Sequence, residues 1–127
     1  MNNCAFYGRL TADPDITYTN TNKVVTKFNI AVTRSFKNKE GKYDADFIPC
    51  VAFDKRGELI GNSFGKGDKI IVMGEMRTET WQDKKTGSTH SMLRLYLNDF
   101  NFVENRQQRQ QSQPAAGYGE YEDLSNF

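Results

Sequence analysis

Four aromatic side chains, each near the edge of a short strand-like segment, offer flat rings beside positive charges. Phe36 lies between Arg34 and Lys37, and Trp81 is followed closely by two further lysines. Such rings suit unpaired nucleic-acid bases, because every base has a π-face on which a ring can stack and every nucleotide carries a phosphate. The pattern predicts that four rings stack on bases, open to water along one groove: Phe36, Phe47, Phe53 and Trp81.

Positive charge is concentrated in one part of the chain, although the whole sequence carries a formal net charge of only +1. Residues 23–42 contain six Lys and Arg residues and a single carboxylate, a local net charge of +5. Cations along a binding surface make salt-sensitive contacts with phosphates. The predicted contacts with the nucleic-acid backbone are Lys23, Lys27, Arg34, Lys37, Lys39, Lys84 and Lys85, together with Arg9 and Arg77, whose strand positions also suit a solvated edge.

Residue types suited to catalysis or metal binding are sparse. His90 is the one histidine and lies in a polar stretch typical of a solvated loop exit, so a Ser/His/Asp triad would depend on it alone. Cys4, Cys50 and His90 lack the close CxxC or HxxxH spacing of a zinc site. The carboxylate pairs at positions 13 and 15 and at positions 44 and 46 occur where turns and strand starts ordinarily use aspartate. We therefore predict no enzyme activity, no metal and no cofactor.

Length and composition favour one compact domain with a tail. The chain has 127 residues, of which 37% are hydrophobic and 13% aromatic, enough for one small core. Apolar runs such as residues 70–73 are far shorter than a membrane span, and the first residues show no secretory signal. We expect a cytoplasmic protein without membrane contact, in which Cys4 and Cys50 are reduced, small and buried.

Alternation of apolar and polar residues dominates the first hundred positions and predicts strands, most clearly over residues 27–32 and 93–97. Between Phe47 and Phe53 both faces are apolar. If Ile48, Cys50 and Ala52 face the core, the two phenylalanines are left on the outer face, where a soluble protein places large apolar groups for a use. The other phenylalanines are predicted to be core or packing residues: Phe6, Phe28, Phe64, Phe100 and Phe102.

One short helix is predicted near residues 54–65, where apolar side chains recur at helical spacing, although Gly61 weakens the prediction. Turn residues at 38–41 and 83–88 separate strands by loops long enough to project as arms. About five strands with one helix between the third and the fourth is the order of an OB-type Greek-key barrel. The fold class is therefore predicted to be all-β, and the pattern alone also permits a small β-roll.

The composition changes after about position 104. Residues 106–113 are nearly all Gln and Arg, and Pro, Ala and Gly follow them, so this stretch cannot supply a core. The last eight residues hold three carboxylates and no cation. We predict a barrel domain over residues 1–104 and, over residues 105–127, a disordered Gln-rich linker that ends in an acidic tip.

The chain resembles the bacterial and phage single-stranded DNA-binding proteins of the SSB family over residues 3–104. The matching segments, in order, are residues 8–14, 17–18, 28–32, 46–53, 67–68 and 74–81. The resemblance implies an OB fold in which Phe36, Phe47, Phe53 and Trp81 stack on bases of single-stranded DNA. Relatives often have tryptophan at the positions of Phe36 and Phe47.

The same resemblance implies a homotetramer that wraps DNA and an acidic tip that docks replication, recombination and repair proteins. The residues that match this tip are Glu122, Asp123, Leu124 and Phe127, without the proline that usually precedes the last phenylalanine. The leading hypothesis is a sequence-tolerant protein that coats and protects single-stranded DNA. The alternatives are an OB-type protein-interaction module that contacts DNA incidentally, and a nuclease built on the same barrel.

Overall fold

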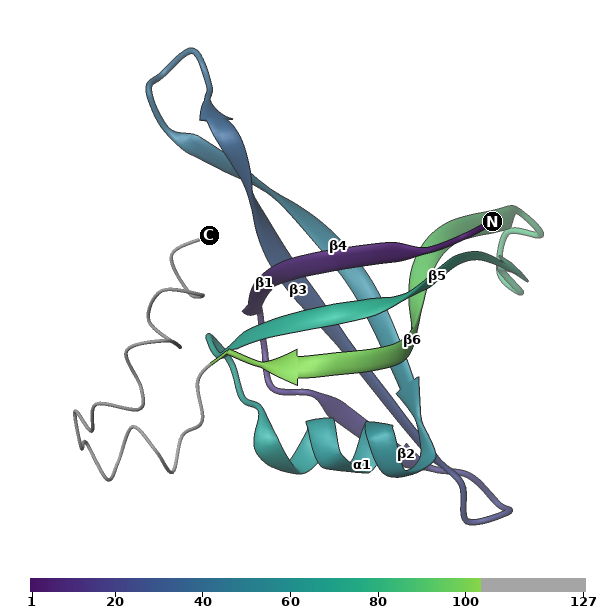
Figure 1. Ribbon diagram of the computed structural model, residues 1–127. Helices are drawn as coiled ribbons and strands as arrows, with labels where there is room; N and C mark the ends of the chain where they lie inside the picture. The colour runs from purple at the N-terminus through teal and green to yellow at the C-terminus, as the bar shows by residue number, and fades with distance from the viewer. Residues whose placement is uncertain (104–127) are drawn as a thin grey trace, which may run out of the picture.

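The computed structural model describes residues 1–103, and its strands form a closed barrel (Figure 1). The strands are β1 (Cys4–Leu10), β2 (Asp15–Tyr18), β3 (Val24–Lys37), β4 (Tyr43–Phe53), β5 (Lys69–Gln82) and β6 (Thr89–Phe102). They follow the order β1-β5-β6-β4-β3-β2, and a β1–β3 pairing closes the barrel, leaving β2 as an extension beside β3. A helix, α1 (Asp54–Ser63), connects β4 to β5. The predicted five-stranded OB-type barrel is confirmed for these residues.

The core follows the alternation in the strands, because every second side chain of a strand points to the same face. In β4, Cys50 and Ala52 are fully buried and Ile48 packs against the core, so Phe47 and Phe53 point outward as predicted. The phenylalanines expected to pack do so: Phe28 and Phe64 are buried, Phe6 and Phe100 pack against the core, and Phe102 stacks on Phe64 with ring centroids 4.9 Å apart.

The two cysteines are free thiols in different surroundings. Cys50 is fully buried, and burial raises the pKa of its thiol to about 12. Cys4 is only half-buried at the start of β1. The prediction that both are buried is therefore right for Cys50 and only partly right for Cys4, because a residue at the end of a strand is covered from fewer sides.

The helix α1 lies across one end of the barrel (Figure 1), where Ile60 is fully buried and Thr26 of β3 donates a 2.7 Å hydrogen bond to the carbonyl of Gly57. Gly61 lowers helix propensity, but it also lets β2 approach. A Cβ at that position would lie 2.2 Å from Cδ1 of Ile16. Among the described residues, no helix has the length and apolarity that crossing a bilayer requires.

Two hairpins extend from the barrel in different directions, which confirms the predicted arms (Figure 1). We define the β3–β4 arm as residues 33–45 and the β5–β6 arm as residues 78–92. Pairing in the first arm is irregular between Thr33 and Lys37, whereas pairing in the second is continuous up to Gln82 and Thr89. Gly41 and Gly87 have positive φ angles in the two turns, a conformation that glycine adopts without steric cost. The arms carry the two predicted rings that do not lie on the barrel.

Candidate nucleic-acid interface

Phe47 and Phe53 share the outer side of β4, six positions apart. They lie opposite Ala31 and Val25 of β3, respectively. Phe47 is 67% exposed and Phe53 41% exposed. Both rings are therefore accessible to a ligand from solvent, as the sequence predicts.

Tyr96 brings β6 to the same side of the sheet. β4 and β6 pair in parallel, with Val51 beside Tyr96, so the tyrosine ring points the same way as Phe53. The centroids of the two rings lie 5.9 Å apart and their planes make an angle of 31°. Tyr96 is half-buried. Tyr96 was not among the predicted site residues, although its alternation with Leu95 and Leu97 places it on the face of β6 opposite the core.

β5 adds charged groups around Tyr96. The Cζ atom of Arg77 lies 4.8 Å from the centroid of the Tyr96 ring. The Tyr96 hydroxyl donates a 2.5 Å hydrogen bond to Oε2 of Glu79, and Nε of Arg94 donates a 3.1 Å hydrogen bond to Oε1. These two bonds, the one from Tyr96 first, hold the pKa of Glu79 below its usual range, although partial desolvation opposes them. The hydrogen bond to Glu79 raises the pKa of Tyr96.

We call this surface the aromatic face, and it comprises Lys27, Phe47, Phe53, Arg77, Glu79, Arg94 and Tyr96. Strand register accounts for it, because residues directly opposite in neighbouring strands point to the same side. Lys27 lies opposite Val51, and Arg77 lies opposite Arg94. The face therefore combines rings and cations with one carboxylate that is already hydrogen-bonded.

Trp81 lies on the β5–β6 arm, where it faces His90 across the two strands. The two ring centroids are 5.7 Å apart, the planes are 29° apart, and Trp81 is 47% exposed. His90 belongs to β6 and not to a loop, which corrects the sequence prediction. Polar residues surround His90 because both faces of this arm are open to water, and a polar stretch is also typical of a loop.

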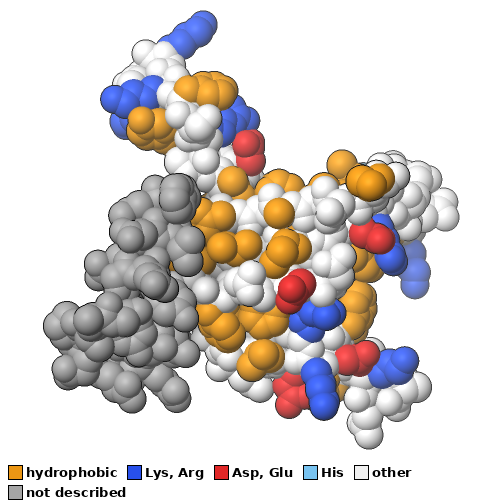
Figure 2. All heavy atoms as spheres, viewed as in Figure 1, with side chains coloured by type: hydrophobic (Ala, Val, Ile, Leu, Met, Phe, Trp, Pro, Cys, Tyr) orange, Lys and Arg blue, Asp and Glu red, His pale blue; other side chains and the backbone are white. Residues whose placement is uncertain are grey.

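The β3–β4 arm carries Phe36, which is 70% exposed, and Tyr43, which is 55% exposed. Nζ of Lys37 lies 5.9 Å from the centroid of the Tyr43 ring. Hydrophobic and basic side chains gather on this arm (Figure 2). Phe36 and Trp81 therefore lie on separate arms, with Phe47 and Phe53 on the barrel, and a single groove shared by the four rings stays a prediction. Because β3 and β5 each continue from the barrel into an arm, the rings are distributed over a longer surface than the barrel alone offers.

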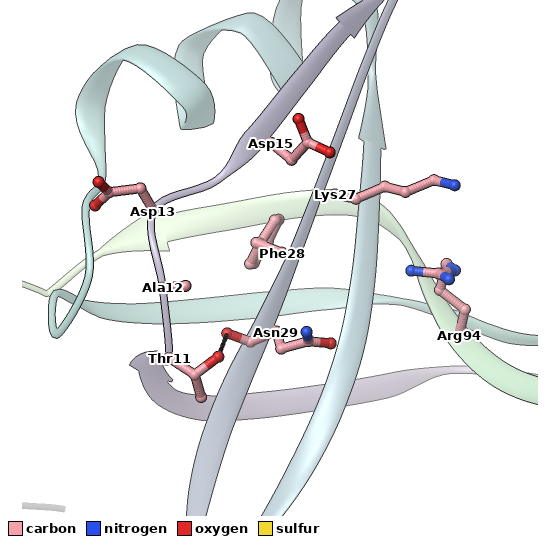
Figure 3. Close-up of a pocket in the computed structure, with 8 residues that line it drawn as sticks. All are labelled: Thr11, Ala12, Asp13, Asp15, Lys27, Phe28, Asn29 and Arg94. Atoms are coloured by element: carbon pink, nitrogen blue, oxygen red, sulfur yellow. Dashed lines mark hydrogen bonds between the residues drawn. The ribbon is translucent and has the colours of Figure 1, made fainter.

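A hollow of about 240 Å³ lies beside the aromatic face (Figure 3). Lys27 and Arg94 bring their charged ends to the same side of it, whereas Asp13 lies at the opposite side. Oδ1 of Asp13 accepts a 2.8 Å hydrogen bond from the backbone N–H of Lys66, which links the β1–β2 connection to the loop between α1 and β5. The hollow is lined by Thr11, Ala12, Asp13, Asp15, Lys27, Phe28, Asn29 and Arg94.

The predicted phosphate-binding cations fall into two groups. The lysines are exposed on β3 or in the turns: Lys23, Lys27, Lys37, Lys39, Lys84 and Lys85. The arginines contact the protein itself. Arg34 donates hydrogen bonds of 2.8 and 3.1 Å to the two carboxylate oxygens of Asp46, which lowers the pKa of that carboxyl group. Arg77 pairs with Glu75 at 3.1 Å. Arg9 donates a hydrogen bond to the carbonyl oxygen of Gly67.

The sequence of this chain matches a known protein family over the whole barrel. The family model described as "Single-strand binding protein family" matches residues 1–103. The chain belongs to this family. "Single-stranded DNA-binding protein 2" of Streptococcus agalactiae serotype III is 38% identical over 108 residues, which is 85% of this chain and 81% of the relative. "Single-stranded DNA-binding protein" of Caldanaerobacter subterraneus subsp. tengcongensis is 34% identical over 119 residues, 94% of this chain and 73% of the relative.

The family match spans the whole barrel, both arms and the aromatic face. The predicted contacts did not include Tyr43 on the β3–β4 arm or, on the aromatic face, Glu79, Arg94 and Tyr96. For the last two, the polar face of β6 was the available signal. The predicted tip residues Glu122, Asp123, Leu124 and Phe127, and the whole of the tail that the sequence predicts to be disordered, lie outside the described residues.

Proposed function

We propose that this member of the single-strand binding protein family binds single-stranded DNA with little sequence preference and coats unpaired strands. The observation that carries the proposal is the exposure of Phe47 and Phe53 on the barrel, near the exposed cation Lys27 of the neighbouring strand β3. A row of exposed rings marks a binding surface on a soluble domain. The family match and the names of the relatives favour single-stranded DNA as the ligand.

Stacking and charge contribute to this binding in different ways. A base stacked on an aromatic side chain contributes roughly 1 to 3 kcal/mol and is sequence-tolerant, because every base offers a π-face. Lysines bind phosphates with an affinity that falls as salt rises, because counterions are released. The rings therefore supply most of the affinity that persists at high salt, and duplex DNA cannot use them because its bases are paired and stacked on one another.

The arms extend the proposed contact beyond the barrel. Phe36 with Lys37 and Lys39 would bind one stretch of the strand, and Trp81 with the lysine pair in the β5–β6 turn would bind another. Three arginines already bind groups of the protein in the absence of DNA: Arg9, Arg34 and Arg77. Each would have to give up that hydrogen bond or ion pair to bind a phosphate. We assign these arginines a smaller share of the binding free energy than the lysines for that reason.

We also propose that the chain assembles with copies of itself into a homotetramer. The outward side chains of β1 and β5 support self-association. Ala5 lies opposite Met73 and Tyr7 lies opposite Ile71, so these four residues form an apolar set that, unlike the aromatic face, contains no charged group. Hydrophobic side chains are visible over these strands (Figure 2). A mass in solution equal to one chain at micromolar concentration would refute assembly.

We propose further that the protein acts without catalysis in replication, recombination and repair, and that its acidic tip recruits enzymes of those processes. Carboxylates followed by a terminal phenylalanine offer both charge and an apolar anchor to a basic groove. Retention of such enzymes by the full chain, and their loss when residues 120–127 are deleted, is the expected result. Equal retention by both chains would contradict the role of the tip.

A salt series with single-stranded and duplex oligonucleotides of one sequence tests the main proposal. We expect the full chain to bind the single strand more tightly at every salt concentration, with a gap that widens as salt rises, because only the single strand exposes bases for stacking. Fluorescence anisotropy of a labelled oligonucleotide measures both affinities. Equal affinity for the two forms would defeat the proposal.

A further inference from the structure

We propose that Tyr96 is a positioning residue of the aromatic face, which holds the Phe53 ring where a base can stack on it. The inference rests on the proposed function, because it assigns a role within the same surface. Tyr96 comes from β6 and Phe53 from the end of β4, so the parallel β4–β6 pairing is what brings them together.

The contact between the two rings is direct. Their centroids lie 5.9 Å apart with a 31° angle between the planes, a tilted arrangement within the range of favourable aromatic pairs. Tyr96 is half-buried and also lies under the guanidinium of Arg77, whereas Phe53 keeps 41% of its surface exposed. The free ring surface in this pair is therefore that of Phe53, and Tyr96 is the support beside it.

Tyr96 can serve as a support because it is itself held at both ends. Its backbone pairs with Val51 of β4, and its hydroxyl donates a 2.5 Å hydrogen bond to Glu79 of β5. Glu79 is in turn bound by Nε of Arg94 at 3.1 Å. A ring that is held in its binding orientation before the ligand arrives loses less conformational entropy on binding. Through the ring contact, Tyr96 would also restrict the orientations of Phe53, the last residue of β4.

The same contacts explain why a carboxylate occupies a surface that would bind a polyanion. Oε1 and Oε2 of Glu79 each accept a hydrogen bond, one from a cation, so the carboxylate is not left free to repel a phosphate. The charge of Lys27 also acts favourably on Glu79. Glu79 therefore fits the role of an anchor for Tyr96 better than that of a contact with DNA.

A double-mutant cycle between Tyr96→Leu and Phe53→Ala tests the inference by measuring affinity for a single-stranded oligonucleotide at high salt. We expect Phe53→Ala to weaken binding roughly 5- to 150-fold, and Tyr96→Leu to weaken it about 2- to 13-fold. In the Phe53→Ala background, Tyr96→Leu should have no further effect, because the ring it positions is gone. Tyr96→Phe keeps the supporting ring but loses the hydrogen bond to Glu79, so its loss should be smaller than that of Tyr96→Leu.

Three outcomes would overturn the positioning role. Additive losses in the cycle would mean that Tyr96 contacts DNA independently of Phe53. Unchanged affinity of Tyr96→Leu in the otherwise unaltered chain would mean that Phe53 needs no support. A loss with Tyr96→Phe as large as with Tyr96→Leu would mean that the ring is not what matters.

Two further measurements distinguish a positioning role of Tyr96 from an effect on folding and from a failure of the proposed function. Thermal unfolding of each variant detects a purely structural effect, which would lower the melting temperature whichever residue stands at position 53. Carbon-13 labelling of phenylalanine reports the Phe53 ring without DNA, and its signals should broaden or shift in Tyr96→Leu. An unaltered chain that shows no preference for single strands would refute the proposed function, whereas unchanged Phe53 signals would refute the positioning role alone.

Discussion

Replacing Phe47 and Trp81 together by alanine is expected to weaken single-stranded DNA binding by about 2 to 6 kcal/mol, a loss of roughly 30-fold to 20,000-fold, at high salt. Each ring stacks on one base in the proposed complex, and the two rings lie on separate elements, the barrel and the β5–β6 arm, so their losses should add. Both rings are exposed, at 67% and 47%, so their removal leaves the core intact. Oligonucleotide titration of the single and double variants measures the effect.

A matched control is Leu59→Ala on α1. Leu59 is 48% exposed, similar to Trp81, but it lies on α1 and belongs neither to the aromatic face nor to an arm. This variant should bind DNA as the unaltered chain does. If the double variant instead keeps its affinity for DNA and loses a protein partner in a pull-down, the exposed rings serve a protein-interaction module.

Gly74→Ala is expected to destabilise the barrel by about 3 kcal/mol or more. A Cβ at this position would lie 2.0 Å from the carbonyl oxygen of Tyr96 and 2.9 Å from Cα of Leu97. Both are backbone atoms of β6, at the point where the β5–β6 register shifts between Met73 and Gly74. A backbone held in a sheet cannot move aside as a flexible side chain can, so strands would have to separate. Urea unfolding followed by circular dichroism measures the loss.

Gly87→Asn provides the comparison for this prediction. Gly87 has a φ angle of +73° in the β5–β6 turn, and a Cβ there would meet nothing within 4 Å. Asparagine tolerates this left-handed conformation better than other side chains do, so the variant should lie within about 1 kcal/mol of the unaltered chain. An unfolding midpoint for Gly74→Ala equal to that of Gly87→Asn would show that β5 and β6 can adjust at the bulge.

The barrel was predictable because its signals are local. Strict alternation in β3 and β6, and the two apolar faces of β4, follow from the two-residue period of a strand. The exposure of Phe47 followed from placing the smaller residues Ile48, Cys50 and Ala52 inside. The two arms followed from turns too long for a tight hairpin.

The sequence does not show surroundings that depend on another strand. His90 was expected in a loop, because no local signal shows that it pairs with Trp81 on an extended arm. Gly61 counted against the helix, because nothing nearby in the chain shows that Ile16 packs against it. Arg34 stays a predicted phosphate contact, but its pairing with Asp46 depends on the register between β3 and β4, which no local signal shows.

By itself, the order of residues determined which side chains leave the core and where positive charge accumulates, because strand periodicity and composition are properties of neighbouring positions. Tertiary structure alone decided that Phe53, Tyr96, Glu79 and Arg94 meet on one surface, since three strands contribute them. The β4–β6 contact is a parallel pairing between residues more than forty positions apart, and no periodicity within either strand specifies its register. Closure of the barrel sets that register, and with it the place of each group on the aromatic face.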